Sequence, residues 1–333
     1  MCPVTWWWNC AEAIVESDLD PAAGNIDRAF YAQARDPPMI VKTQQFKLPP
    51  LFLFNAAASL LFLGAGSYVV RDILFAESVT QCNERYAETM LFALQRPSGE
   101  TLTAADLQSR LSGRDWGLLE NAKIIKINDG PAPVALRVDL PQGSASKGAS
   151  DEPRSGMGFR WTPDALKRAS TACLTYNIWL PKDFDFGTGG ALPGLYGASA
   201  DDLMSQDGKP GFSTRYRWQG DGKTEVRAAT ADSPDGTPLP IDPNWFKLER
   251  GQWVRLEKEV VLNTPGSHNG ILRVWIDGKM RFERKNLMFN PKEGGRFAGV
   301  IADVHYSRAD LTWAPSPKTA SVLLSPLELR WRE

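Results

Sequence analysis

The chain has 333 residues, of which 43% are hydrophobic and 23% charged, and its formal net charge is −1. This composition is that of a globular protein long enough for one large domain or two modest ones. A near-neutral charge argues against the clustered basic surface that binds nucleic acid, so no nucleic-acid partner is expected.

An uncharged stretch at residues 48–70, LPPLFLFNAAASLLFLGAGSYVV, is the first element along the chain. Because about 20 apolar residues cross a bilayer as a helix, this stretch predicts a transmembrane signal anchor. Lys42 and Lys47 precede it, whereas only Arg71 follows immediately. This excess of basic residues predicts that residues 1–47 are cytoplasmic and that the rest of the chain is periplasmic or extracellular.

Two alternatives to the anchor stay open. Small residues at 64–67 could form the cleavage site of a signal peptide, which would give a secreted product. The stretch could instead be a buried helix of a soluble domain. Residues 1–38 show no pattern of stable structure, and Met39 would make a conventional start for a signal anchor. A native product that begins at Met39 is therefore a further hypothesis.

Residues 71–116 are expected to form a helical stalk or brace. The sequence ESVTQCNERYAETMLFALQ, which starts at residue 77, places apolar side chains at helical spacing without Gly or Pro. A second, shorter helix is predicted from Thr103, whose hydroxyl can cap AADLQSRL, to Gly113.

Residues 117–333 are predicted to form an all-β domain, a jelly-roll (concanavalin A-like) β-sandwich. Short alternating or apolar runs follow one another between Gly, Pro, Asn and Asp clusters, with few helices. The runs are NAKIIKI, VALRVDL, LTYNIWL, GFSTRYRW, WVRLEKEVVL, GILRVWI, KMRFERK, RFAGVIADVHY and SVLLSPLELRW. Asp277 and Gly278 between two runs predict a hairpin, because this turn requires positive φ. The polar residues 143–156 could be a mobile flap or a linker.

Four cysteines are present: Cys2, Cys10, Cys82 and Cys173. No CxxC pair or zinc-type spacing with histidine occurs, so no metal site is expected. Only Cys82 and Cys173 follow the hydrophobic segment, and in an oxidising compartment they could form a disulfide or stay as two buried thiols. The sequence also lacks an Asp-rich calcium loop, a phosphate-binding glycine motif and a GxSxG motif, and no cofactor is expected.

The most distinctive stretch is LTYNIWLPKDFDFGTGGALPGLYG at residues 174–197. It resembles the strand, "FPxxFDF" turn and "GGKLPGLYGG" loop of family-14 polysaccharide lyases, which cleave alginate and related glucuronate polymers. Three further matches follow in order: GFSTRYRW with "FSxRxxWR", GSHNGILRVWIDGKMRF with "NxxxGxLxVWxDGxxV", and the closing strands with "DxxWAP". The resemblance covers about residues 120–333 and implies a jelly-roll fold.

Lyases of this kind neutralise the uronate carboxylate, remove the C5 proton and protonate the leaving O4. The resemblance implies catalytic roles for Ser213 and Arg215, which match the FSxR motif. Strand geometry places Ser213, Arg215 and Arg217 on one face, and arginine can hold a carboxylate through two hydrogen bonds. A solvent-facing strand surface with weak salt bridges is the alternative.

The chain departs from the family pattern where several proton-transfer groups are expected. Ala191 stands in place of the lysine of GGKLPG. Arg227 and Ala229, in TEVRAAT, occupy the places of two tyrosines, and VHYS replaces a terminal "FFGG". An unaltered family mechanism is therefore not expected.

Replacement proton carriers are His305 and Tyr306, with Asp303 on the strand face of His305 and able to orient its imidazole. Tyr196 and Tyr216 are further candidates. Against this, a histidine near a strand end is usually a surface or satisfied polar group, and His268 is expected to be solvated. The candidate substrate-binding residues are Tyr196, Arg217, Arg227 and Asp303.

Three functions are compatible with these features. The first is a membrane-anchored lyase that cleaves acidic, uronate-containing polysaccharide by β-elimination, with Arg215 neutralising the carboxylate and Ser213 positioning it. The second is a non-catalytic carbohydrate-binding protein, which the absent lysine and tyrosines favour. The third is a scaffold in a polysaccharide assembly system.

Overall fold

The computed structural model describes residues 80–111, 114–143, 155–198, 211–234, 237–241, 246–291 and 295–333. The predicted membrane segment, the hypothetical start at Met39 and most of the loop at 143–156 lie outside these residues. Among the residues described, none of the helices has the length and apolar character needed to cross a membrane.

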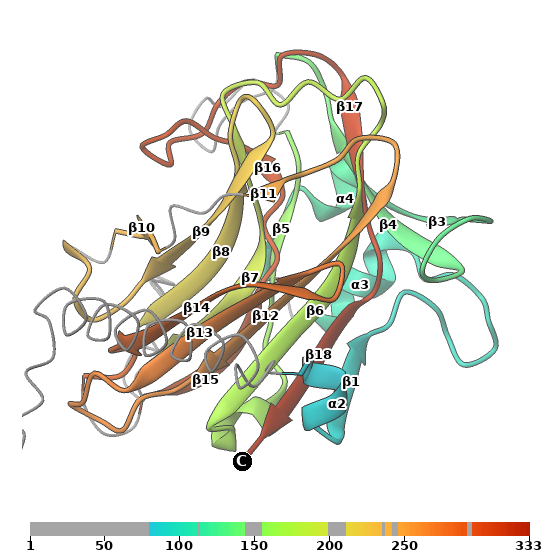
Figure 1. Cartoon of the computed structure of the whole chain (residues 1–333). Helices are drawn as coiled ribbons and strands as arrows, with labels where there is room; N and C mark the ends of the chain where they lie inside the picture. Colours follow the sequence, from blue (N-terminus) through green and yellow to red (C-terminus); the bar gives the residue numbers. More distant parts are fainter. Residues whose placement is uncertain are drawn as a thin grey trace, which may run out of the picture. The chain divides into compact units, whose positions relative to one another are not determined.

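The described residues form a β-sandwich of two antiparallel sheets that lie face to face (Figure 1). In the first sheet the strand order is β14 (Lys279–Leu287), β13 (Gly270–Ile276), β12 (Trp253–Val261), β6 (Thr171–Trp179), β17 (Ala320–Leu324), β4 (Val134–Leu140) and β3 (Ala122–Lys126). Next to β6 lies also β18 (Leu327–Arg332), which pairs with β1 (Glu88–Phe92).

The second sheet has the order β10 (Leu239–Pro240), β9 (Lys223–Ala229), β8 (Phe212–Trp218), β7 (Gly190–Ala198), β15 (Arg296–Ile301), β5 (Gly158–Trp161) and β2 (Asp115–Trp116). Two short strands complete it: β11 (Phe246–Lys247) pairs with β9, and β16 (His305–Tyr306) pairs with β7. This arrangement is consistent with the predicted jelly roll.

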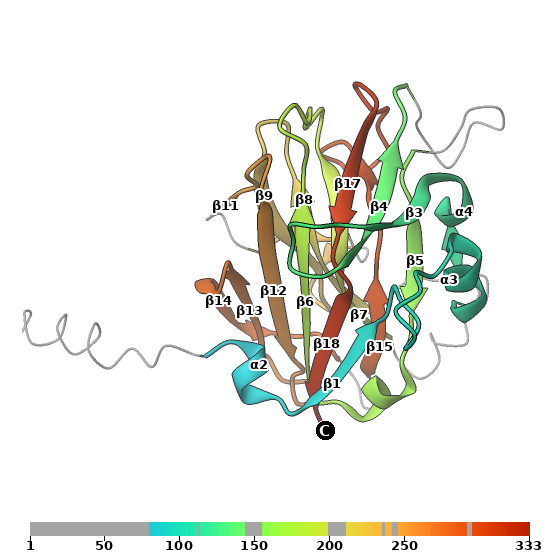
Figure 2. The same cartoon turned by 90° about the vertical axis from the view of Figure 1, so that its right-hand side faces the viewer.

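Helices are few and short in the described part of the chain: α2 (Cys82–Arg85), α3 (Ala104–Arg110), α4 (Leu118–Asn121) and the 3-10 helix η1 (Asp164–Arg168). Figure 2 shows α3 and α4 beside β3. The predicted cap of α3 is confirmed, because Thr103 and Asp106 form a reciprocal capping box. The predicted hairpin between β13 and β14 is confirmed too, with Asp277 at φ 50° and Gly278 at φ 77°.

The expectation of a helix from residue 77 onward is wrong for most of its length. Within the described part of this stretch, which starts at residue 80, only the four residues of α2 are helical, and Glu88–Phe92 form the strand β1. This strand lies along β18 (Figure 2). Four of its five side chains are exposed and only Phe92 is buried, so its sequence carries no strand-like alternation. Backbone pairing with β18 therefore overrides the local helical pattern.

The Gly- and Pro-rich segment that resembles a family loop is in fact β7, which lies between β8 and β15 in the second sheet. Its glycines allow the backbones to approach closely. A Cβ added at Gly194 would lie 1.7 Å from the Thr214 carbonyl oxygen, and one at Gly197 would lie 1.9 Å from the Phe212 ring. A side chain at either position would push β8 away from β7.

Candidate functional site

Strand β8 presents a different chemistry on each of its faces. Phe212, Tyr216 and Trp218 are buried in the core between the sheets, and the Tyr216 hydroxyl donates to the Glu257 carbonyl oxygen of the first sheet at 3.0 Å. Because side chains alternate along a strand, Ser213 and Arg215 lie on the opposite face, which is turned away from the first sheet. The predicted two-faced strand is confirmed, and Tyr216 lies in the core, away from the outer face.

A charged cluster of three residues lies on this outer face of the second sheet. Arg215 donates from Nη1 to Asp303 Oδ2 at 2.8 Å, and Arg160 donates from Nη1 to Asp303 Oδ1 at 3.1 Å. The Asp303 side chain is 9% exposed, whereas Arg215 and Arg160 are 26% and 30% exposed. Two guanidinium groups around one carboxylate leave one net positive charge on the cluster.

The electrostatics of the cluster show competing effects on Arg215. Burial lowers the pKa of its guanidinium most strongly, the neighbouring Asp303 raises it, and the charge of Arg160 lowers it further. Because arginine stays protonated in proteins, the lowered pKa means that burial has taken solvating water away from a group that keeps its positive charge. A second anion bound next to Arg215 and Arg160 would stabilise this positive charge.

Gly158 makes the cluster sterically possible. A Cβ added there would lie 2.3 Å from Asp303 Oδ1 and 2.2 Å from Trp116 Nε1. Any larger residue would therefore displace both the carboxylate and the neighbouring indole. The short run GFRW, which carries Gly158 and Arg160, forms β5 and was not recognised in the sequence, although Arg160 between two aromatic residues is a signal of a strand with one polar face.

Tyr196 and Ser213 lie directly opposite each other on β7 and β8. The Arg160 guanidinium carbon is 5.8 Å from the centre of the Tyr196 ring, so the ring borders the charged cluster. Burial raises the pKa of the Tyr196 phenol above its ordinary value, although the charges of Arg160 and Arg114 oppose this. The phenol is therefore protonated at neutral pH, while Ser213 is almost fully buried.

His305 lies on the same outer face, next to the cluster. Its register partner on β7 is Ala191, the position of the absent family lysine. Nδ1 lies 2.9 Å from the Tyr306 carbonyl oxygen, so this nitrogen carries the proton in the neutral ring and Nε2 is left as an acceptor. Burial lowers the pKa of His305, while Asp303 and the Tyr306 carbonyl raise it, and the net direction is down.

Tyr306 points to the other face and is not part of this site. Its ring is fully buried in the core against Phe184 and Trp218, and its hydroxyl donates to the Asp185 carbonyl oxygen at 2.5 Å. The hypothesis that Tyr306 carries a proton during catalysis is therefore wrong, because neighbouring residues of a strand face opposite sides of the sheet.

The two other predicted arginines are engaged with acceptors of the protein itself. Arg217 is buried, and its Nη2 donates to the carbonyl oxygens of Thr188 and Ser307, both at 3.3 Å. Arg227 donates to Glu225 Oε1 at 2.7 Å and to the Pro238 carbonyl oxygen at 3.0 Å. Their observed contacts support neighbouring loops, in contrast with the partly exposed Arg215.

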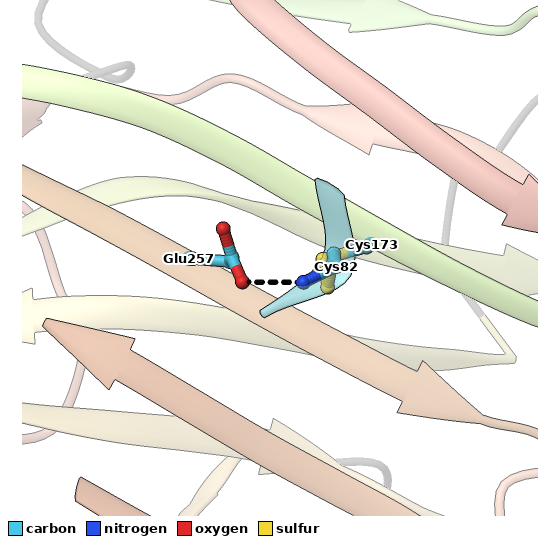
Figure 3. A group of neighbouring side chains, drawn as sticks. All are labelled: Cys82, Cys173 and Glu257. Atoms are coloured by element: carbon cyan, nitrogen blue, oxygen red, sulfur yellow. Dashed lines mark hydrogen bonds between the residues drawn. A yellow bond between two sulfur atoms is a disulfide. The ribbon is translucent and has the colours of Figure 1, made fainter. Parts of the chain in front are cut away.

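Cys82 and Cys173 form a disulfide that joins α2 to β6, with Cα atoms 6.3 Å apart. Figure 3 shows Glu257 beside it, and Glu257 Oε1 accepts a hydrogen bond from the Cys82 backbone N–H at 2.9 Å. The two sulfurs and this carboxylate lie close enough together to suggest metal ligands. Because the sulfurs are bonded to each other, they are not the free thiolates that bind a metal.

Comparisons with known proteins agree with this architecture. Residues 129–324 match the family model of polysaccharide lyase 14. The fold resembles the PL-14 alginate lyase of Aplysia kurodai at 18% identity and a TM-score of 0.57, with 74% of this chain and 99% of that one covered. It also resembles alginate lyase vAL-1 of a Chlorella virus at 21% identity and a TM-score of 0.51, covering 64% and 90%.

The alginate lyase Aly36B is similar as well, at 14% identity and a TM-score of 0.55, with 74% and 98% covered. A search of curated protein sequences gave no match. At these identities the structural likeness shows the fold, whereas the family model spans more than half of the chain. The chain therefore belongs to polysaccharide lyase family 14.

Proposed function

We propose that this protein binds uronate-containing polysaccharide on the outer face of the second sheet and cleaves it by β-elimination. The observation that carries the proposal is the cluster of Arg160, Asp303 and Arg215, with its partly exposed guanidinium groups and one net positive charge. A guanidinium fork matches a carboxylate in geometry and charge, so Arg215 is the group that neutralises the uronate carboxylate. The alginate lyases of similar fold support this substrate class.

His305 supplies the proton transfers in this proposal, and Tyr196 contributes to sugar binding. The lowered pKa of His305 keeps its imidazole neutral near pH 7, with Nε2 able to accept the C5 proton. The electron pair of the C5–H bond forms the C4=C5 double bond as the C4–O4 bond breaks. The imidazolium of His305 then returns its proton to the leaving O4, while Tyr196, beside Arg160, contacts the sugar.

We also propose that residues 48–70 anchor the protein in a membrane with the β-sandwich outside the cytoplasm. The uncharged length of this segment and the basic residues before it support this topology. The disulfide between Cys82 and Cys173 supports it as well, because disulfides persist in oxidising compartments. Protease digestion of intact cells should remove the domain if it lies on an accessible outer surface, and digestion of spheroplasts should remove it if it is periplasmic.

A non-catalytic carbohydrate-binding function is the second candidate, and a specific observation favours it. His305 is only 6% exposed, and its ring stacks on Trp313 at 4.2 Å between ring centres. Proton abstraction by His305 would therefore require the Trp313 side chain to move. Binding to the charged cluster requires no such movement.

The decisive experiment measures cleavage and binding together. The detergent-purified full chain is incubated with polymannuronate, polyguluronate and polyglucuronate, and the unsaturated product is followed by its ultraviolet absorbance. Calorimetry measures binding of the same polymers. Arg215→Ala removes the carboxylate partner, Arg215→Lys keeps the charge without the fork, and Arg281→Ala is the matched control on an exposed position of β14.

Product from the unmodified protein and from Arg281→Ala, but not from Arg215→Ala, would establish the lyase. We expect Arg215→Lys to fall between them, because a lysine ammonium cannot bind a carboxylate bidentately. Binding that depends on Arg215 without product would establish the second candidate. Absence of both binding and product with all three polymers would overturn the proposal.

A further inference from the structure

An aromatic group lies at the end of the outer face where β2 and β16 meet the loop after β16. Trp313 stacks on His305 with ring centres 4.2 Å apart and planes at 8°, and Trp116 lies 4.6 Å from Trp313 and 5.8 Å from His305. The histidine is buried, whereas both tryptophans are only partly buried. The surface that this group offers to a ligand is therefore made of indole rings.

The aromatic group borders the charged cluster directly. Trp116 is the register partner of Gly158, and a Cβ at Gly158 would touch both Trp116 Nε1 and Asp303 Oδ1, at 2.2 Å and 2.3 Å. The Trp116 indole and the Asp303 carboxylate therefore lie on either side of Gly158. A ligand whose charged group reaches Arg215 or Arg160 has its neighbouring part within reach of the tryptophans.

The loop that carries Trp313 is held in place by its own hydrogen bonds. The Arg308 backbone N–H donates to the Thr312 carbonyl oxygen at 2.7 Å, and Arg308 Nη1 donates to the Trp313 carbonyl oxygen at 2.5 Å. Asp310 Oδ1 accepts from the Thr312 backbone N–H at 3.0 Å. At the start of the loop, buried Arg217 donates to the Ser307 carbonyl oxygen. A surface fixed in this way loses little conformational entropy when a ligand binds.

We propose that Trp116 and Trp313 form a stacking subsite for the pyranose ring next to the uronate whose carboxylate binds Arg215 and Arg160. A pyranose has an apolar face of C–H groups, which packs against flat aromatic rings, and tryptophan combines this apolar face with a polar edge. This inference rests on the binding step of the proposed function, uronate binding at the charged cluster, which both candidate functions share, and it adds the recognition of a second sugar unit with Trp313 stacked on His305. Arg217 acts in it as a positioning residue for the loop.

The test compares ligands of one and four sugar units. A single uronate can fill the charged cluster alone, whereas a tetrauronate also covers the tryptophans. Trp116→Leu and Trp313→Leu should weaken tetrauronate binding by about tenfold, which corresponds to the loss of about 1.4 kcal/mol. The same substitutions should leave binding of the monouronate within about twofold, as measured by ligand-observed NMR. Arg215→Ala should weaken both ligands.

The matched control is Trp253→Leu, on β12 of the first sheet, where the indole donates to the Asp129 carbonyl oxygen. Trp313→Tyr should retain most of the affinity, because an aromatic face remains, and thermal unfolding with near-ultraviolet circular dichroism verifies that each variant is folded. Unchanged tetrauronate binding by folded Trp116→Leu and Trp313→Leu would overturn the subsite. Failure of the unmodified protein to bind either uronate ligand would overturn the proposed function itself.

Discussion

Lys258 lies on β12, where strand alternation places the apolar Leu256 and Val260 toward the core. The lysine side chain is fully buried among them. Its Nζ donates to the Thr214 carbonyl oxygen at 2.9 Å and lies 3.9 Å from the centre of the Tyr216 ring. Burial lowers the pKa of Lys258 well below its ordinary value of 10.5, and the charge of Arg215 lowers it further.

This environment predicts an unusual dependence of stability on pH. In the unfolded chain Lys258 binds a proton at pH values below 10.5, whereas in the fold its proton affinity is reduced. Between the folded and the unfolded pKa, the unfolded state therefore holds more protons, and stability rises with pH. The contribution of this one group is at most about 1.4 kcal/mol per pH unit.

Lys258→Met keeps an unbranched chain of similar length without the amine. We expect the variant to be at least as stable as the unmodified protein at neutral pH and to lose its relative advantage between the folded-state pKa of Lys258 and 10.5. Chemical unfolding at a series of pH values up to 10.5 measures the difference. Lys279→Met, at an exposed position of β14, is the control. A difference between Lys258→Met and the unmodified protein that stays constant over the whole series up to pH 10.5 would contradict the prediction.

For single residues, the sequence predicted which side chains of β8 lie on its outer face, but it did not predict which residues of other strands they contact. Ser213 and Arg215 could be found because strand alternation is local. Asp303 was predicted to orient the His305 imidazole, but its carboxylate binds Arg160 and Arg215, and His305 Nδ1 faces the Tyr306 carbonyl oxygen instead. The two arginines come from strands far apart in the sequence, and Arg160 was missed. Tyr306, the alternative to His305, points into the core, because adjacent strand residues face opposite sides of the sheet.

Among the elements, α2 shows best what local patterns could not reveal. The outer face of the first sheet carries Glu257 and Glu259, both buried. Glu259 accepts hydrogen bonds from Arg85, Tyr86 and Arg273, while Glu257 accepts from the backbone of Cys82. The segment of α2 and Tyr86 supplies donors to both carboxylates, together with Arg273 of β13. A charged strand such as WVRLEKEVV gave no sign of this in the sequence.

The disulfide is expected to hold this covering segment in place. It closes a separation of 91 residues, and bridges across loops of this size stabilise a fold by about 2–4 kcal/mol. We therefore expect the double substitution Cys82→Ser and Cys173→Ser to lower the free energy of unfolding by that amount. Proteolytic cleavage near residues 80–87 should become faster, because α2 would detach from the sheet.

Urea unfolding and limited proteolysis followed by mass spectrometry check this prediction. Addition of a dithiol reductant should reproduce the effect in the unmodified protein and should change nothing further in the double variant. Equal stability of the oxidised protein and the double variant would show that the hydrogen bonds to Glu257 and Glu259 hold α2 without the disulfide.

For the molecule as a whole, the electrostatic attraction of acidic polysaccharide must come from the charged cluster and not from the net charge. The net charge of the chain is −1, and in the described residues many charged groups pair with one another, as Glu259 does with Arg273 at 2.6 Å. The cluster around Asp303 adds only one net positive charge. A near-neutral molecule produces little long-range field to steer an anionic polymer toward its site.

The salt dependence of binding follows from this distribution. Raising the ionic strength from about 0.1 M to 1 M shortens the Debye length from about 10 Å to 3 Å, which removes long-range steering but screens a contact ion pair much less. We expect the association rate with a tetrauronate to fall by less than about threefold, and the dissociation rate to carry most of the loss of affinity. Surface plasmon resonance at several salt concentrations measures both rates.

Arg215→Ala should bind weakly with little remaining salt dependence, whereas Arg281→Ala should behave like the unmodified protein. A steep fall of the association rate would instead indicate an extended basic surface and contradict recognition by a single cluster.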